Sequence, residues 1–344
     1  MDLSDKTLIA TLIDSNNNST PKIIEGKNLE AGKAYNLPEK TKVDIDINVS
    51  TMGTLSSILN QTQKNTITAM RVTGEINKDD FNVMRNEMPK LKYLDLREVK
   101  CAEDKIPNFA FGQDFDNPNY PSANIKISTI ILPNSIRTIG KWAFSGCTSL
   151  SGILKIPNEV TTIGEAAYNG CTGFSGDLKL PNNLKRIENW AFRACTGLNG
   201  SLIFPDGLHT IGEAAFHGCS EFTGDLIIPD GVTRFNMAIF KDCYGFDGIL
   251  KFSNKLSWID YFAFEGCKNI KGKVYLPITL TDIEMGAFLG CNSVEAFRFA
   301  NVKPFGNRRI FPNDYSTIIE VPSEAVGSYR SYYGSYYKYI IRGY

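Results

Sequence analysis

The sequence has no excess of either charge, because its 37 lysines and arginines are balanced by 37 aspartates and glutamates. Nucleic acid binding depends on clustered basic side chains that displace counterions from phosphates. No such cluster stands out, so neither nucleic acid nor an anionic membrane surface is an expected partner. The sequence also lacks an apolar run of about 18 residues, which a membrane-spanning helix requires.

Histidine is scarce as well, since His209 and His217 are the only two in the 344 residues. Zinc sites need several cysteine and histidine ligands in close spacing, and these two residues do not supply that pattern. The first residues lack the basic start and apolar stretch of an export signal. We therefore expect a mature or recombinant segment from which a leader and an anchor have been removed.

What the sequence does contain is a strict period of two dozen residues, which three independent columns of residues share. Cysteines, prolines and aromatic residues each recur at this interval, with Ser253 as the one exception among the prolines. A fixed period of this length is the signature of a solenoid, in which each unit packs only on its neighbours. The three columns are Cys147, Cys171, Cys195, Cys219, Cys243, Cys267 and Cys291; Pro133, Pro157, Pro181, Pro205, Pro229 and Pro277; and Phe144, Tyr168, Phe192, Phe216, Phe240, Phe264 and Phe288.

A single unit, residues 154–177, shows how each turn of the solenoid is built. Leu154 and Ile156 alternate with Lys155, which predicts a short strand with one buried face that ends at Pro157. Inward apolar residues then recur three and four residues apart, which predicts a short helical or 3₁₀ turn. The predicted fold class is a leucine-rich-repeat solenoid, α/β to mainly β. It is a right-handed coil with a parallel concave sheet, short helical or 3₁₀ turns on the convex side, and a cap at each end.

The start and the end of the periodic region divide the sequence into four segments. Residues 1–48 are strand-like without the repeat, and we interpret them as the tail of a neighbouring β module. Residues 49–123 are predicted to form an N-terminal cap with irregular repeats, in which Asn77 opens a helix with Asp80 three residues on. Residues 124–294 hold the seven regular units, and residues 295–344 form a C-terminal strand and a tyrosine-rich cap.

Five tyrosines of the C-terminal segment recur three and four residues apart, so on a helix they would form one broad stripe. Such a stripe is either the buried face of a cap or an exposed aromatic platform for sugars, and the buried face is the favoured interpretation. The residues are Tyr329, Tyr332, Tyr333, Tyr336 and Tyr337.

The repeated signature I-P-x-x-V-x-x-I-G-x-x-A-F-x-G-C, found for example at 132–147 and 156–171, resembles the BspA-type leucine-rich repeats. The likeness covers roughly residues 91–321, and the segment before it is similar to the N-terminal cap of such proteins from Bacteroidetes. This resemblance implies a bacterial protein that is secreted or anchored at the cell surface. It also implies relatives that act as adhesins, which bind host matrix proteins or promote attachment.

The regular cysteines suit a disulfide ladder, a metal site or free buried thiols. Equivalent residues on adjacent coils lie within disulfide reach, but their side chains point the same way and each lies in an apolar pattern. Free structural thiols are therefore the favoured interpretation. Cys101 lies outside the period and is the one candidate for a reactive thiol, but no neighbouring histidine or catalytic signature supports it.

The insertion D-F-D-N-P-N places several oxygen-bearing side chains close together, namely those of Asp114, Asp116, Asn117 and Asn119. Such ligands can hold calcium, although the spacing is not that of a complete calcium loop. An ordinary solvated turn is the favoured interpretation, since aspartate, asparagine and proline are standard turn residues. No catalytic residue, metal site or cofactor is predicted.

The outward strand positions form the candidate ligand-binding site, on the face predicted to be concave. It comprises Ile153, Lys155, Asp177, Lys179, Ile203, Asp225, Ile227, Ile249, Lys251 and Tyr275. Two interpretations stay open: a solvated face with scattered isoleucines, or a binding strip in which four isoleucines form an apolar patch with a polar rim.

We expect a monomeric, non-enzymatic cell-surface or secreted scaffold that recognises a host or extracellular protein, or a glycan, through this face. The alternative is a structural spacer that presents neighbouring modules. A small-molecule pocket is not expected, because the packed interior of a solenoid offers no cavity.

Overall fold

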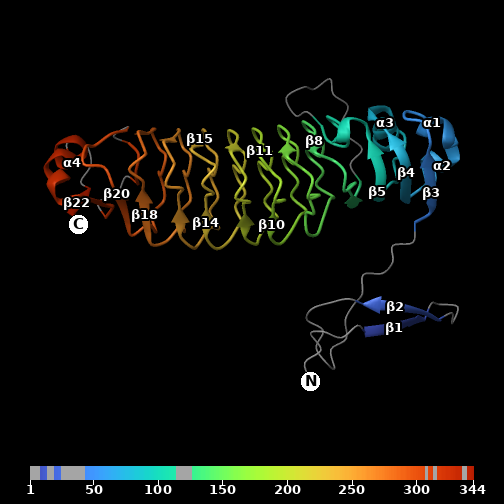
Figure 1. Cartoon of the computed structure of the whole chain (residues 1–344), viewed down its shortest axis with the longest axis horizontal. Helices are drawn as coiled ribbons and strands as arrows, with labels where there is room; N and C mark the ends of the chain where they lie inside the picture. Colours follow the sequence, from blue (N-terminus) through green and yellow to red (C-terminus); the bar gives the residue numbers. More distant parts are fainter. Residues whose placement is uncertain are drawn as a thin grey trace. The chain divides into compact units, whose positions relative to one another are not determined.

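The computed structural model describes residues 8–13, 19–24, 43–113, 126–306, 309–312, 316–334 and 339–344. The chain divides into two compact units, Met1–Lys42 and Val43–Tyr344. In the first unit, strands β1 (Leu8–Ile13) and β2 (Ser19–Ile24) pair in antiparallel fashion. In the second unit, successive coils follow one another between a cap at each end (Figure 1).

The N-terminal cap is built on a parallel sheet of four strands in the order β3-β4-β5-β7. The strands are β3 (Ile45–Val49), β4 (Ala69–Ile76), β5 (Tyr93–Cys101) and β7 (Thr129–Ile131). Strand β3 therefore belongs to the cap, and the division between the units falls after Lys42, earlier than the boundary at 48 expected from the sequence. The alternating pattern of 45–49 predicted a strand, but only the pairing with β4 shows which unit it joins.

Helices α1 (Leu55–Ile58), α2 (Gln61–Thr66) and α3 (Lys78–Asn86) belong to this cap, and a 3₁₀ turn, η1 (Ala102–Asp104), follows β5. As predicted, Asn77 is the N-cap of α3, with Asp80 completing a capping box. The buried Asp80 carboxylate also accepts the N–H groups of Gly53 and Leu55, at 2.7 and 2.9 Å. One side chain thus fixes the start of α3 and the entry to α1.

Most regular coils contribute short strands to two parallel ladders rather than to the single sheet expected from the sequence. Residues 154–157, where the sequence predicted a strand, form none, although Leu154 and Ile156 are buried as expected. The first ladder is a series of three paired sets: β10 (Leu178–Lys179) with β12 (Leu202–Ile203), β14 (Leu226–Ile227) with β16 (Leu250–Lys251), and β18 (Lys273–Leu276) with β20 (Ala296–Phe299). The second ladder is a series of two paired sets. One contains β6 (Lys105–Ile106), β8 (Thr138–Ile139), β9 (Thr162–Ile163), β11 (Arg186–Ile187) and β13 (Thr210–Ile211), and the other contains β15 (Arg234–Phe235), β17 (Trp258–Ile259) and β19 (Asp282–Ile283). The strands of this second ladder are two residues long, too short to show a period of two in the sequence.

The remaining side of each coil consists of turns, where the sequence predicted short helical or 3₁₀ turns. Some N–H groups make 3₁₀-type bonds within the coil, such as Cys195 to Phe192 at 3.2 Å. Others bond to the next coil, such as Phe192 to Ala215 at 2.8 Å. Trp190 and Ala194 have φ values of 58° and 56°, a left-handed backbone that stops the turn from continuing as a helix.

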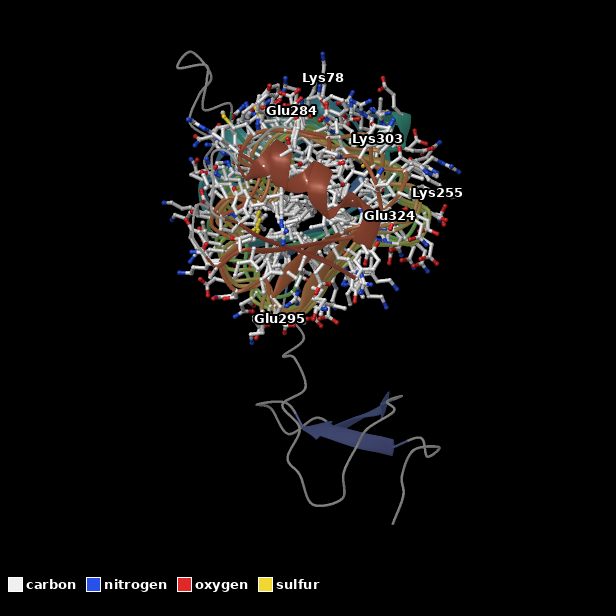
Figure 2. All side chains as sticks on the ribbon, turned by 90° about the vertical axis from the view of Figure 1, so that its left-hand side faces the viewer. Lys78, Lys255, Glu284, Glu295, Lys303 and Glu324 are labelled. Atoms are coloured by element: carbon white, nitrogen blue, oxygen red, sulfur yellow. The ribbon has the colours of Figure 1, made fainter. Side chains whose placement is uncertain are left out.

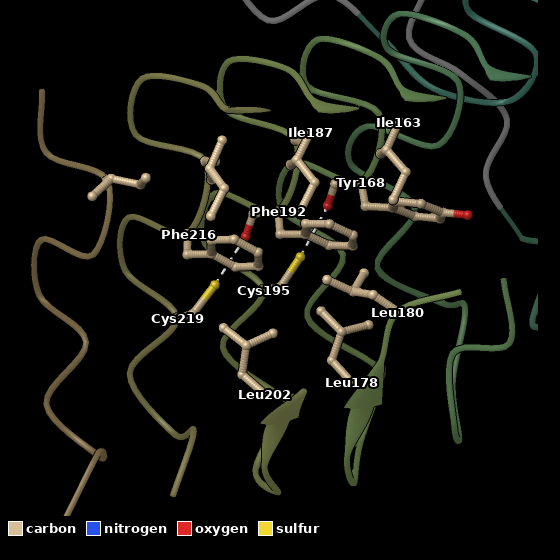
Figure 3. Close-up of a cluster of buried hydrophobic side chains, with 14 of the residues drawn as sticks. Ile163, Tyr168, Leu178, Leu180, Ile187, Phe192, Cys195, Leu202, Phe216 and Cys219 are labelled. Atoms are coloured by element: carbon tan, nitrogen blue, oxygen red, sulfur yellow. Dashed lines mark hydrogen bonds between the residues drawn. The ribbon is translucent and has the colours of Figure 1, made fainter. Parts of the chain in front are cut away.

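The core is organised around a stack of aromatic rings, which we call the aromatic stack (Figure 3). Neighbouring rings from Phe144 to Phe288 lie 5.2–5.6 Å apart and are tilted by at most 19°. Phe111, from the irregular repeat, extends the stack before Phe144 at 6.0 Å, and Phe311 extends it beyond Phe288 at 6.3 Å. Because equivalent positions pile on one another, one aromatic column in the sequence becomes one continuous packing element.

The C-terminal cap continues the first ladder in the order β18-β20-β21-β22, with β21 (Ile318–Val321) and β22 (Ile340–Gly343). Between these strands lie η2 (Ser323–Ala325) and α4 (Val326–Tyr333), which crosses the end of the solenoid (Figure 2). Around it, labelled charged residues such as Lys255 and Glu284 point outward (Figure 2).

The tyrosine stripe forms a buried cap face, as favoured from the sequence, in the case of Tyr329 and Tyr333. Their hydroxyls donate hydrogen bonds to the carbonyls of Asn301 and Phe305, and the partly buried Tyr332 donates to Gly306 at 2.7 Å. Tyr336 and Tyr337 lie outside the described residues. The cap thus closes the apolar end of the solenoid with ring surface while each hydroxyl finds a backbone acceptor.

The aromatic stack predicts where the fold is most sensitive. Replacing Phe216 with alanine should lower the free energy of unfolding by about 3–5 kcal/mol, because it opens a cavity between Phe192 and Phe240. Guanidinium denaturation followed by circular dichroism measures this change. The matched control is Leu289→Ala at a side chain that is 37% exposed, where we expect a cost of about 1 kcal/mol or less. Equal costs for the two variants would contradict this account of the core.

Candidate functional site

The ten predicted binding residues are all exposed, and we call this surface the strand face. Eight of them lie in or next to strands of the first ladder, whereas Ile153 and Lys155 lie on the coil before β10, where no strand forms. The large apolar side chains of the strand face stand well clear of the core: Ile203 is 46% exposed, Ile227 50% and Tyr275 58%. Their neighbours in the strands, such as Leu202 and Leu226, are buried. The alternation of lysine or isoleucine with leucine therefore predicted the orientation of these side chains correctly.

The four isoleucines do not form one unbroken strip. Ile203 and Ile227 occupy the same position on adjacent coils. Ile249 is on the coil after Ile227, two residues before its register partner Lys251, and so lies diagonally from it. The coil between Ile153 and Ile203 presents Asp177 and Lys179 instead. The apolar centre of the strand face therefore consists of Ile203, Ile227 and Ile249.

Asp177 and Asp225 have a structural role that was not anticipated. The Asp177 Oδ1 atom accepts the N–H of Ser201 at 2.7 Å, and the Asp225 Oδ1 atom accepts that of Ile249 at 2.9 Å. Each carboxylate reaches the next coil beside a glycine. A Cβ at Gly248 would lie 2.1 Å from the Asp225 Oδ1 atom. These aspartates thus join neighbouring coils. The sequence signal for this role is the glycine in the next unit, Gly200 for Asp177 and Gly248 for Asp225.

A cluster of charged residues closes the C-terminal end of the strand face. The Glu320 carboxylate, 5% exposed, accepts hydrogen bonds from Lys273 at 3.0 Å and Arg342 at 2.7 Å. Burial alone would raise the pKa of Glu320, but the hydrogen bonds from Arg342 and Lys273 outweigh it and hold this pKa below its usual value. The Arg298 guanidinium lies 3.7 Å from the centre of the Tyr344 ring, so the edge of the sheet is covered by charge.

The cysteines form a hydrogen-bonded series, the cysteine ladder, which agrees with the favoured interpretation of free buried thiols (Figure 3). Cys219 Sγ donates to the carbonyl of Phe192 at 3.0 Å. The same contact, between a cysteine and an aromatic residue 27 positions earlier, recurs from Cys171 to Cys291 at 3.0–3.2 Å. Cysteine is suited to this position because it is small and apolar yet carries a weak donor. The constant offset between the two columns was visible in the sequence, although its meaning was not.

Burial decides the chemistry of these thiols. It raises the pKa of Cys219 to about 12, and it does the same for Cys101, where the nearby Asp104 adds to the effect. The thiolate is the reactive form of cysteine, so these residues are poor nucleophiles near neutral pH. In the described part of the chain no group of three or more histidine, cysteine, aspartate or glutamate side chains is arranged to hold a metal ion. The segment with Asp114, Asp116, Asn117 and Asn119 lies outside the described residues.

The turns carry an open groove with a volume of about 520 Å³, a feature that the sequence did not predict. Residues from the turns of successive coils line this turn groove, among them Trp142, Trp190, Arg193, His217, Lys241 and Phe262. The expectation of a packed interior is compatible with this finding, because the groove is on the outer surface. Its residues come from the turns of different units, and no short motif joins them.

The stacked coils, the paired ladders and the two caps define a leucine-rich-repeat solenoid. The family model of the BspA type leucine rich repeat region matches residues 118–247 and 248–328, in six copies. Since this match covers more than half of the sequence, the chain belongs to the BspA-type leucine-rich-repeat family. No curated protein matches the chain in sequence. No helix among the described residues is both long enough and apolar enough to cross a membrane.

Several solved structures are similar over nearly the whole chain. A leucine-rich repeat protein from Bacteroides ovatus is 17% identical, with 99% of this chain and 98% of that chain covered and a TM-score of 0.42. A leucine rich cell surface protein from Faecalibacterium prausnitzii is 16% identical, with 99% and 95% covered and a TM-score of 0.37. The pneumococcal vaccine antigen PcpA is 14% identical, with 99% and 97% covered and a TM-score of 0.38.

The cysteine ladder predicts thiols that are inert in the folded protein. At pH 8, we expect a disulfide reagent such as Ellman's to modify none of the eight cysteines within minutes, because they are buried and their pKa values are raised. In guanidinium all eight should react, and this denatured sample is the control. Absorbance of the released thiolate gives both counts. Rapid modification of the folded protein would contradict a continuous buried ladder.

Proposed function

We propose that this chain is a non-enzymatic binding scaffold at the cell surface or outside the cell, and that its strand face binds an extracellular protein. The observation that carries the proposal is the exposure of Ile203, Ile227 and Ile249 at the centre of one face. Full burial of an isoleucine side chain contributes about 1.5–3 kcal/mol, so a partner that covers these residues gains affinity from each of them.

The strand face is also pre-organised. Its side chains project from coils that are held together by backbone ladders and by Asp177 and Asp225. A surface that is already ordered loses little conformational entropy when a partner binds. Lys179 and Lys251 are the register partners of Ile203 and Ile227, and exposed charges of this kind contribute to the rate and specificity of association.

A protein partner is favoured over a glycan at this face because the exposed apolar groups are aliphatic. Aromatic rings are the side chains that stack on sugar rings, and Tyr275 is the one aromatic among the ten residues. Charged residues around a group of isoleucines resemble the composition of a protein interface, which has an apolar centre and a polar rim. Host matrix proteins are the candidates that the adhesin-like family resemblance suggests.

The cysteine ladder is compatible with an extracellular location. Secreted proteins usually hold their cysteines in disulfides, since exposed thiols are oxidised there. Burial and a raised pKa protect thiols from oxidation without a disulfide. The second candidate function is a structural spacer that presents neighbouring modules, and a stiff solenoid is suited to that role as well.

A double substitution distinguishes these functions. Replacing Ile203 and Ile227 with aspartate should leave the fold intact, because both side chains are already about half exposed. We expect it to weaken binding to a matrix-protein ligand by at least about 100-fold, because the buried interface would then contain two unpaired charges. Surface plasmon resonance against a panel of purified extracellular matrix proteins first identifies the ligand and then measures this change.

The matched control is Ile278→Asp, at an isoleucine that is 71% exposed but lies in the turn after β18, outside the strand face. It should bind as the unmodified protein does. Unchanged binding by the double variant would remove the strand face as the binding site. A chain that binds none of the panel would favour the spacer.

A further inference from the structure

The turn groove has a built aromatic wall. It is formed from one position of the repeat, which in successive coils is Trp142, Ala166, Trp190, Ala214, Ala238, Phe262 and Gly286. One or two alanines therefore separate neighbouring rings of this column. The ring of Phe262 lies over the next coil, where a Cβ on Gly286 would come within 2.4 Å of it. Small residues between the rings leave space along the groove.

The backbone beneath these rings is in an unfavourable conformation. Trp142, Trp190 and Phe262 have φ values of 56°, 58° and 56°, in the left-handed region that bulky residues rarely adopt. Alanine and glycine fill the same position in the other coils at lower cost. The left-handed φ recurs at this position in every coil, so it belongs to the repeat, and what distinguishes three of the coils is an aromatic ring in place of alanine or glycine.

Two polar side chains at the groove make no hydrogen bond to the described residues. Trp142 is 4% exposed, and its indole N–H makes no hydrogen bond to a described residue. Asn169 is 8% exposed and lines the same groove, and its side chain makes no hydrogen bond to the described residues. The Trp142 nitrogen is itself enclosed, so a ligand in the groove does not reach it. The Asn169 amide is not fully enclosed and offers a donor and an acceptor to a polar ligand.

The charges of the groove nearly cancel. Lys241 pairs with Glu265 at 2.5 Å, and His217 Nε2 lies 3.4 Å from Asp242. Burial, together with the neighbouring Arg193, lowers the pKa of His217, so this imidazole is uncharged near neutral pH. Arg193 and Glu213 remain, one of each sign, without an ion pair to a described residue. The groove thus offers donors and acceptors without net attraction for an anion.

We propose that the turn groove is a carbohydrate site for an uncharged oligosaccharide. A pyranose ring has an apolar C–H face that packs on Trp190, while its hydroxyls bind Arg193, Glu213 and Asn169. The volume of about 520 Å³ matches a small ligand rather than a protein surface. The site shares no residue with the strand face, so it goes beyond the proposed function and stands independently of it.

The test pairs two tryptophans. A panel of neutral gluco-, manno-, xylo- and lacto-oligosaccharides is screened at about 10 mM, a level that detects even weak sites, by isothermal titration calorimetry. Trp190→Ala should weaken binding of the best saccharide at least about tenfold, because the stacking surface is lost. Trp258→Ala is the matched control and should bind the saccharide normally. The Trp258 ring lies on the second ladder, 5.0 Å from the Arg234 guanidinium, and outside the groove.

Further variants and ligands distinguish binding at the turn groove from binding at the strand face. Trp190→Phe keeps a ring and should retain most of the affinity, which distinguishes loss of stacking from loss of folding. The double variant Ile203→Asp, Ile227→Asp should bind the saccharide normally, so failure of the strand face and failure of this groove are distinguishable. Three results would overturn the proposal. The protein could bind only the charged saccharides 3′-sialyllactose or tetragalacturonate, it could bind none of the saccharides, or Trp190→Ala could abolish binding of a protein ligand instead.

Discussion

The constant length of the repeat, which places each side chain on its equivalent in the next coil, is the constraint on which the rest of the structure depends. Ring packs on ring from Phe144 to Phe288, and backbone N–H groups of the turns bond to carbonyls of the following coil. One unit buries too little apolar surface to offset the entropy of ordering its chain, so stability resides in the contacts between units. Every inward position is consequently restricted, whereas outward positions vary.

Several residues acquire their roles only from this stacking. A cysteine in an isolated coil would be an ordinary small apolar residue, but in the stack Cys219 donates to the carbonyl of Phe192. Asp225 would be a surface carboxylate, yet it accepts the N–H of Ile249 because Gly248 leaves room for it. These contacts hold neighbouring coils in register, which makes the outer surface rigid. A surface that is already ordered loses little conformational entropy when it binds a partner.

The two surfaces proposed to bind ligands differ in the same physical terms. The strand face presents aliphatic residues and lysines on paired strands, a composition typical of a protein interface. The turn groove presents tryptophan beside polar side chains and balanced charges, which is suited to a small polar ligand. The coil places one set on strands and the other on turns, so a single scaffold carries both without competition.

The sequence by itself determined the period, the inward columns, the exposure of residues such as Ile203 and Ile227, and the capping of α3 by Asn77. These features are local or strictly periodic, and period alone decides which side chains point inward. Only the tertiary structure decided the second ladder, the left-handed turns, the contact of Asp225 with the next coil, and the turn groove. Each of these joins residues from different coils, such as Trp142 and Phe262, whose proximity arises from stacking and leaves no local pattern.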